Sequence, residues 1–371
     1  MSLAKRSPAA DIIRIFAFFS VVAVHFLLNN GFYTRSVEGS RMFIMTLMRA
    51  FFIICVPLFL ILSGYLLRKK QLEKKYYGKI GKIILTYVLA SLSCILYSII
   101  FLNQDIGIRK TLLGILGFTA APYAWYIEMY IGLFLLIPFL NIIYNALSSK
   151  GQKLWLIATF IILTSLPSVL NIYDLSSFDW LSLPSSTTAL NKIFPAWWQT
   201  LYPVTYYFIG CYLSEFGLKI NKALCLALII ICTAVSGVFC YWRSYKVLFI
   251  KGAWCSYYSL FNIVLTTLVF VFILNLNYDK MPSGVSKGLQ KISGLCLGGY
   301  LVSWIFDDIC YPILAKKVPA IIDRLEYFVI IVPVVFILSL IASYILSLIQ
   351  QLIEKGFALV CQLFKKKKSC A

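Results

Sequence analysis

The sequence predicts an all-α, polytopic membrane protein, a transmembrane bundle of about ten spanning helices with both chain termini in the cytoplasm. Three observations predict this fold: the composition, the length of the apolar segments and the distribution of basic residues. Apolar residues make up 61% of the 371 residues and charged residues only 13%, whereas soluble domains carry about 25% charged residues. A soluble core of this size cannot bury so much apolar surface, so the excess is expected to face lipid.

The apolar segments have the length that a bilayer requires. A helix needs about 20 mostly apolar residues to cross the hydrocarbon layer. Ten segments meet this requirement, and they cover residues 9–29, 43–67, 80–102, 125–146, 154–172, 198–216, 222–241, 256–275, 292–313 and 325–350. We therefore expect one integral-membrane domain over residues 1–371, ending in a basic cytoplasmic tail at 352–371.

The basic residues predict the orientation. If the N-terminus is cytoplasmic, the predicted cytoplasmic segments hold 21 of the 34 Lys and Arg residues, the external segments hold 11, and two lie within spans. Basic residues favour the cytoplasmic side of a membrane. The net charge of +20 therefore reflects membrane topology. It does not indicate nucleic-acid binding, because the basic residues lie between apolar runs and not on one polar domain.

Three ionisable residues lie in the first predicted span: Asp11, Arg14 and His25. Such groups are costly inside a membrane and are functional candidates for that reason. The spacing from Arg14 to His25 puts both on one helix face, within about 20° of each other and roughly 16 Å apart. Asp11 lies about one turn before Arg14 on nearly the same face.

This stripe fits a substrate that enters from the cytoplasm. Arg14 can hold a phosphate or amide group of an acyl-CoA, with Asp11 beside it, and an extended phosphopantetheine arm is similar in length to the stripe. A neutral His25 can take a proton from an acceptor hydroxyl as a general base. Structural roles stay open: Arg14 can snorkel to the inner interface, Asp11 can complement the helix N-terminus, and His25 can be an interhelical hydrogen-bonding residue.

Further candidates lie near the predicted membrane surfaces. Lys79 and Lys82 begin the third span, where they are topology signals and also candidates for binding CoA phosphates. Asp307, in the ninth span at the depth of His25, is the first choice to orient the imidazole. The acceptor-side candidates are Arg49, Trp125, Tyr126, Glu128 and Trp180. For Arg49 and Glu128 structural pairing is the favoured interpretation, and for the tryptophan-rich segment around Trp180 an interfacial aromatic belt is favoured.

No metal site is expected, because His25 is the only histidine and the eleven cysteines form no CxxC pair. The sequence indicates no tightly bound cofactor. It also gives no oligomeric state.

Several segments resemble the acyltransferase family 3 membrane proteins. Arg14 and His25 match the family's R-x10-H first helix, and Ser63-Gly64-Tyr65 matches the motif that closes its second span. Trp125-Tyr126 and the aromatic-Gly-Cys-aromatic segment around Gly210 follow in the family's order. One departure is Ser303, which stands where many members have a second histidine.

The resemblance implies a membrane O-acyltransferase. Such an enzyme moves an acyl group, commonly acetyl from cytoplasmic acetyl-CoA, to a hydroxyl of a cell-envelope polysaccharide or lipid-linked glycan such as O-antigen or capsule. It implies a multi-pass protein of a bacterial plasma (inner) membrane whose partners are acyl-CoA, the glycan and the lipid bilayer. The alternative is a transporter or polysaccharide exporter, which ten spans with buried charges fit equally well.

Overall fold

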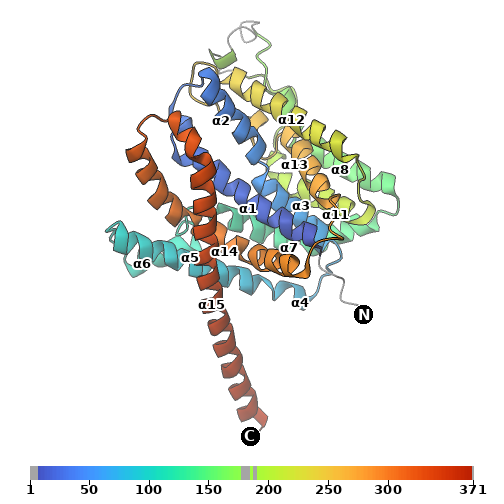
Figure 1. Cartoon of the computed structure of the whole chain (residues 1–371). Helices are drawn as coiled ribbons and strands as arrows, with labels where there is room; N and C mark the ends of the chain where they lie inside the picture. The colour runs from blue at the N-terminus through green and yellow to red at the C-terminus, as the bar shows by residue number, and fades with distance from the viewer. Residues whose placement is uncertain (1–6, 177–183, 187–189, 370–371) are drawn as a thin grey trace.

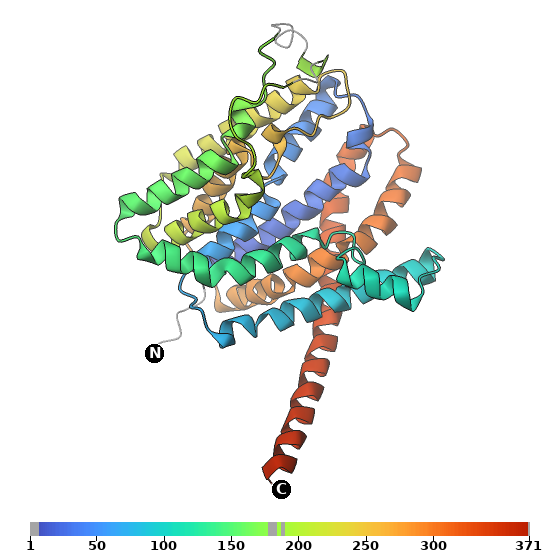
Figure 2. The same cartoon turned by 180° about the vertical axis from the view of Figure 1, so that it is seen from behind.

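The computed structural model describes residues 7–176, 184–186 and 190–369, and the regular elements in these ranges are all helices, arranged as a bundle (Figures 1 and 2). The α-helices are α1 (Pro8–Asn29), α2 (Gly39–Phe52), α3 (Cys55–Leu67), α4 (Lys74–Tyr77), α5 (Ile80–Phe101), α6 (Ile108–Leu116), α7 (Trp125–Ala146), α8 (Lys150–Thr164), α9 (Pro167–Leu170), α11 (Tyr202–Phe216), α12 (Lys222–Arg243), α13 (Leu260–Leu274), α14 (Ser283–Lys317) and α15 (Phe328–Ser369). Short 3-10 helices are η1 (Phe32–Thr34), η2 (Pro184–Ser186), η3 (Gln199–Leu201), η4 (Ala253–Cys255) and η5 (Asp323–Tyr327). Within the described ranges, eight helical segments are long and apolar enough to cross a membrane.

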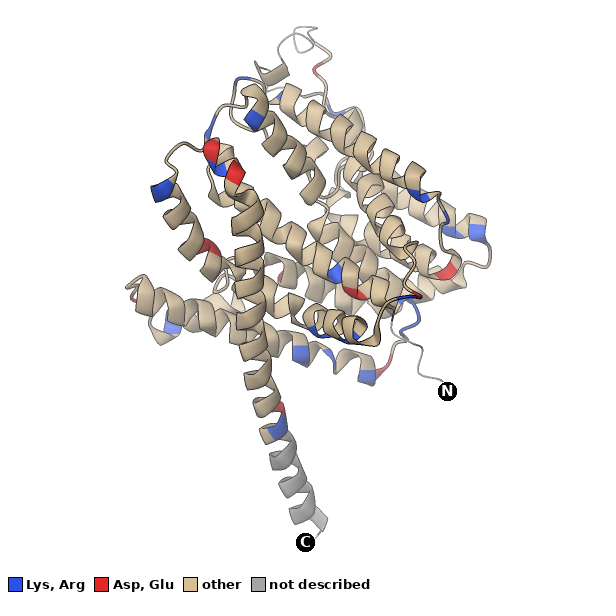
Figure 3. Cartoon of the chain, in the orientation of Figure 1, with Lys and Arg blue, Asp and Glu red and all other residues tan. Residues whose placement is uncertain are grey.

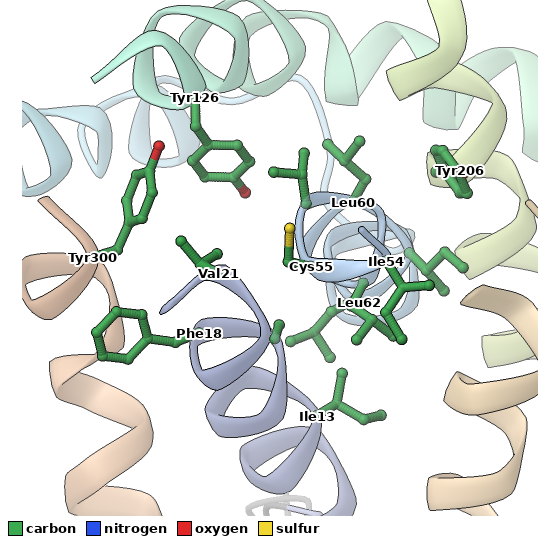
Figure 4. Close-up of a cluster of buried hydrophobic side chains, with 14 of the residues drawn as sticks. Ile13, Phe18, Val21, Ile54, Cys55, Leu60, Leu62, Tyr126, Tyr206 and Tyr300 are labelled. Carbon is green, nitrogen blue, oxygen red and sulfur yellow. The ribbon is translucent and has the colours of Figure 1, made fainter. Parts of the chain in front are cut away.

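Helix α1 lies in the middle of the bundle and packs against α3, α14 and α15. It starts at Pro8, where a proline costs no hydrogen bond, and it runs unbroken for 22 residues. Its apolar side chains, among them Ile13, Phe18 and Val21, enter a cluster with residues of α3, α7 and α14 (Figure 4). This burial fixes the one helix that carries both Arg14 and His25.

The second predicted span, 43–67, is two helices, α2 and α3, joined at Ile53 and Ile54. Pro57 explains the break. A proline lacks the N–H that would bond the carbonyl four residues earlier, and its ring clashes with that carbonyl. The carbonyl in question is that of Ile53, where α2 gives way to α3.

Two glycines allow α3 and α11 to touch backbone to backbone. A Cβ on Gly64 would lie 1.9 Å from the carbonyl oxygen of Tyr207, and a Cβ on Gly210 would lie 2.0 Å from that of Ile61. Lipid tails are as apolar as the side chains of a membrane helix, so the hydrophobic effect does not drive such helices together. Close packing of small residues is instead a main source of helix association in membranes. The glycines of the two sequence motifs are therefore packing residues.

The predicted spans 154–172 and 198–216 contain shorter helices. The first holds α8, of 15 residues, followed by the one-turn α9, and the second holds η3 followed by α11, also of 15 residues. Because these two segments are consecutive, the direction of every other helix is the same whether both cross the membrane or neither does.

Helices α14 and α15 extend beyond their predicted spans, 292–313 and 325–350. Helix α14 has 35 residues and starts at Ser283, and α15 has 42 residues. At 1.5 Å per residue α15 is roughly 63 Å long, which is about twice the thickness of the hydrocarbon layer. Its end leaves the bundle as a separate rod (Figure 1).

Charged residues gather at the ends of the helices and are sparse between them (Figure 3). At the end predicted to be cytoplasmic, Glu215 lies 2.9 Å from Lys153 and 3.2 Å from Arg68. At the opposite end Arg41 pairs with Asp323 and Glu326, at 2.5 and 2.6 Å. Each cluster joins segments that the charge count assigns to one side of the membrane.

Candidate active site

The end of α1 that is predicted to face the outer side of the membrane meets α14 at a cluster of His25, Asp307 and Tyr123, here called the outer cluster; "inner" and "outer" below follow this predicted orientation. The Nδ1 atom of His25 lies 3.4 Å from Oδ2 of Asp307, which is long for a hydrogen bond. The hydroxyl of Tyr123 donates to the same carboxylate oxygen at 2.7 Å, and its ring lies against the imidazole with centroids 3.8 Å apart. Asp307 is 2% exposed and His25 12% exposed at the side chain, so the imidazole retains an accessible edge.

The second carboxylate oxygen of Asp307, Oδ1, is buried and has no hydrogen-bond donor among the described residues. Catalytic hydrogen bonds are often long before substrate binds and shorten in the reacting complex. A small rotation of the carboxylate or the imidazole would bring Asp307 into hydrogen-bond contact with Nδ1. The arrangement can then hold the ring with Nε2 directed away from Asp307, ready to accept a proton.

Neighbouring groups fix the outer cluster. The Asn29 side chain donates to the hydroxyl of Tyr123 at 3.4 Å and to the backbone carbonyl of His25 at 3.0 Å. Tyr300 donates its hydroxyl to the backbone carbonyl of Tyr123. Ser303 bonds the carbonyl of Tyr300, within its own helix, at 2.8 Å. The serine at the position of the family's second histidine therefore acts here on the α14 backbone.

Asp308, the neighbour of Asp307, belongs to a different contact. Its carboxylate accepts a hydrogen bond from Tyr97 of α5 at 2.9 Å. The two adjacent carboxylates thus serve two tyrosines on different sides of α14, and Asp307 is the one beside His25.

Towards the inner end of α1, Arg14 reaches α14. Its Nη1 atom donates to the hydroxyl of Ser293 at 2.5 Å and lies 3.5 Å from the Asp11 carboxylate. The Arg14 side chain keeps 26% of its surface exposed, and it lines a cavity of about 230 Å³ between α1, α3, α5, α7 and α14, here called the Arg14 cavity. A cation at the wall of an otherwise apolar and aromatic cavity suits a ligand with one anionic or strongly polar group.

Two tyrosines form one wall of the Arg14 cavity. Tyr126 of α7 and Tyr300 of α14 both line it and meet edge to face, with ring centroids 5.9 Å apart (Figure 4). Tyr300 is also the residue that bonds the backbone of Tyr123 in the outer cluster. Tyr300 therefore contacts both the Arg14 cavity and the outer cluster.

The two predicted phosphate-binding lysines lie in different surroundings. Lys82 lines a second cavity, of about 700 Å³, at the inner ends of α5, α14 and α15. Lys79, directly before α5, is exposed and lines neither this cavity nor the Arg14 cavity. The structure thus brings Lys82, and not Lys79, next to a space that a ligand can fill.

The acceptor-side candidates are dispersed. Arg49 is bound to the Tyr33 hydroxyl at 2.7 Å and to the Cys255 carbonyl at 3.1 Å, and it lines a separate small cavity. Trp125 is 39% exposed and stacks on Tyr257. Tyr126 lines the Arg14 cavity, and Glu128 is exposed on α7. Trp180 lies outside the described residues.

Sequence reasoning did not single out Tyr123 or Ser293, although both contact a predicted site residue. Tyr123 precedes α7 in the segment Pro122-Tyr123-Ala124, and Ser293 is one serine among many on α14. Their roles depend on the pairing of helices far apart in the chain, which periodicity within one segment does not reveal.

A family model described as an acyltransferase domain matches residues 8–348, nearly the whole chain. A search of curated proteins gave no match. A search of solved structures likewise gave no match. Within the described residues, no group of three or more His, Cys, Asp or Glu side chains is placed to hold a metal ion.

Proposed function

The chain belongs to the acyltransferase family whose model matches residues 8–348, and from this premise we propose that it is a membrane O-acyltransferase that moves an acetyl group from cytoplasmic acetyl-CoA to a hydroxyl of a cell-envelope glycan. The observation that carries the proposal is the layout of α1. Its inner half places Arg14 in a cavity of about 230 Å³, and its outer half places His25 beside the buried Asp307.

The donor occupies the inner side in this proposal. Arg14, held by Asp11 and Ser293, binds a polar or anionic group of the pantetheine arm through its guanidinium. The apolar and aromatic walls of the Arg14 cavity accept the rest of the arm. The thioester then reaches the tyrosine wall at Tyr300, on the inner side of the outer cluster.

The acceptor hydroxyl approaches His25 from the outer side. Its oxygen attacks the thioester carbonyl as Nε2 of His25 takes the hydroxyl proton, and Asp307 stabilises the imidazolium that forms. The C–S bond then breaks, the CoA sulfur leaves, and the imidazolium returns the proton to it. The products are the acylated glycan and free CoA, so atoms and charge balance, and His25 is the only imidazole in the chain.

The acceptor we propose is a polysaccharide or lipid-linked glycan of the O-antigen or capsule type, on the outer side of a bacterial inner membrane. The support is the family membership together with the multi-pass bundle. A base near the outer membrane surface suits an acceptor that never enters the cytoplasm. Acyl-CoA, in contrast, is available only inside.

The deciding experiment compares wild type with His25→Gln at matched protein level in membranes. Acetyl groups are followed from labelled acetyl-CoA to the glycan, and the esters released by mild alkali are counted. We expect His25→Gln to lower transfer by about 10²–10⁴-fold, because glutamine restores hydrogen bonding without basicity. Near-normal ester content in this variant would overturn the assignment of His25, and the absence of transfer by the wild type to any envelope glycan would overturn the proposed reaction.

A further inference from the structure

The second cavity, here called the lysine cleft, lies between the inner ends of α5, α14 and α15 and has a volume of about 700 Å³. Three lysines line it: Lys82 from α5, and Lys287 with Lys291 from α14. Lys287 and Lys291 are one helical turn apart and therefore share a face of α14. Figure 3 shows basic residues along the inner ends of α5 and α14.

Helix α15 forms the wall opposite the lysines, and hydrogen bonds of its Gln350 side chain hold it there. Gln350 accepts a hydrogen bond from Thr86 of α5 at 2.9 Å and donates to Glu354 at 2.9 Å and to the Lys82 carbonyl at 3.4 Å. The bonds to Thr86 and to the Lys82 carbonyl tie α15 to α5 across the cleft. The extension of α15 beyond its predicted span, 325–350, therefore forms part of a built cavity.

The charge of the lysine cleft favours an anion. Lys82, Lys287 and Lys291 have no ion-pair partner within the described ranges, and Glu354 is the one carboxylate that lines the cleft there. Three ammonium groups against one carboxylate leave an excess of positive charge. Phosphate is an anion that lysine commonly binds, as a point charge with three donors.

The lysine cleft adjoins the Arg14 cavity. Ile83 and Leu297 line both spaces. Along α14 the distance from Lys291 to Tyr300, at the outer wall of the Arg14 cavity, is roughly 14 Å at 1.5 Å per residue. A ligand with phosphates at the lysines and a long, narrow arm can therefore occupy both spaces at once, with the end of its arm at the tyrosine wall.

We propose that the lysine cleft binds the nucleotide end of acyl-CoA, with Lys82, Lys287 and Lys291 on its 3′-phosphate and diphosphate. This inference rests on the proposed function, since it supplies the part of the donor that the Arg14 cavity is too small to hold. The lysine cleft then makes the enzyme select CoA thioesters over pantetheine thioesters, which carry the same acyl group and arm without the nucleotide. Shorter thioesters would enter the Arg14 cavity but bind weakly.

The first test measures binding of acetyl-CoA, dephospho-CoA and acetyl-pantetheine to purified protein in neutral-lipid nanodiscs. We expect Lys82→Gln, Lys287→Gln and Lys291→Gln each to weaken acetyl-CoA binding by roughly 3- to 10-fold and to leave acetyl-pantetheine unchanged. The salt dependence of acetyl-CoA binding should fall in parallel. Lys222→Gln is the control, because Lys222 is an exposed lysine at the predicted cytoplasmic end of α12 and lies outside the lysine cleft.

The second test fills the lysine cleft without changing charge. Gly294 lines it, and a Cβ there would meet nothing within 4 Å. Gly294→Leu should therefore fold and should weaken acetyl-CoA binding more than acetyl-pantetheine binding. Gly288, on the same helix, also has nothing within 4 Å but lies outside the cleft lining, so Gly288→Leu should match wild type and controls for the gain in helix propensity.

The outcomes separate the two proposals. Wild-type binding of acetyl-CoA with no change in the lysine and Gly294 variants overturns the nucleotide site and leaves the proposed reaction standing. Failure of the wild type to bind any acyl-CoA overturns the proposed reaction itself. Anionic lipid headgroups present the same phosphate chemistry, so retention of an anionic lipid is measured by native mass spectrometry. Loss of that lipid in the lysine variants with unchanged acetyl-CoA binding would make the lysine cleft a lipid site.

Discussion

At the scale of single residues, Asp307 and its neighbour Asp308 make different contacts. Asp307 and Asp308 are adjacent in sequence, yet one faces His25 and Tyr123 while the other faces Tyr97. A carboxylate beside an imidazole fixes the ring orientation and stabilises its protonated form. The pair therefore provides an internal comparison with the same chemistry and nearly the same depth.

We expect Asp307→Asn to lower turnover by at least about 10-fold, and Asp308→Asn to have a much smaller effect. The matching tyrosine variants extend the comparison: Tyr123→Phe removes the donor to Asp307, and Tyr97→Phe removes the donor to Asp308. The measurement is the rate of acyl-ester formation at saturating donor, with thermal unfolding as the control for folding. Equal activities of the two asparagine variants would remove Asp307 from the site.

Arg14 is expected to act on the donor. Arg14→Gln should weaken acetyl-CoA binding by about 10-fold or more, because a guanidinium that binds a phosphate or carbonyl through two donors is replaced by a neutral amide. Arg14→Lys should restore part of this loss, since it keeps the charge without the planar fork. Ser293→Ala keeps the arginine and removes one bond to it, so it should have the smallest effect. An unchanged donor affinity in Arg14→Gln would refute the assignment.

At the scale of elements, Gly64 and Gly210 set how closely the backbones of α3 and α11 approach each other. Gly64→Ala and Gly210→Ala would each place a methyl group about 2 Å from a carbonyl oxygen of the other helix, and the helices would have to separate. Overpacking of this kind costs roughly 1–3 kcal/mol. Gly132→Ala on α7 is the matched control, since a Cβ there meets nothing within 4 Å. Thermal unfolding in detergent should show a lower midpoint for the first two variants only.

The elements themselves were largely predictable, because apolar length and composition depend on local sequence. The spans at α1, α7 and α12 begin and end within about two residues of the helices. Pro57 indicates a helix break at Ile53, but the prediction treated 43–67 as one continuous span. The extensions of α14 and α15 at the predicted cytoplasmic end were not predicted, because apolar runs define the predicted spans, whereas polar and basic residues continue both helices beyond these runs.

The candidate site was predictable only in part, for a physical reason. Arg14 and His25 lie on one helix, so their relation follows from helical geometry alone. The proximity of Asp307 to His25 could be expected from similar depth, and the structure places the two side by side. The contacts of Tyr123 and Ser293, in contrast, require knowledge of which helices pack together, and a single sequence contains no direct signal for that.

At the scale of the whole molecule, the prediction is an even number of crossings with both termini inside. Reporter fusions after Lys82 and after Ala371 should report a cytoplasmic location, and a fusion after Lys110 should report an external one. The reason is the excess of basic residues in the predicted cytoplasmic segments. An external C-terminus would contradict this topology and, with it, the access of donor from inside.

The position of Tyr300 also bears on whether protons and metabolites can leak across the membrane through the protein. A protein that takes one substrate from the cytoplasm and meets another outside is a potential leak for protons and metabolites, each driven by the voltage across the membrane. Tyr300, bonded to the Tyr123 backbone and packed against Tyr126, touches both the Arg14 cavity and the outer cluster, so in the proposed reaction it is placed to limit such a leak. In the proposed reaction the acyl group would then pass from donor to acceptor without an open aqueous path that discharges the electrochemical gradient.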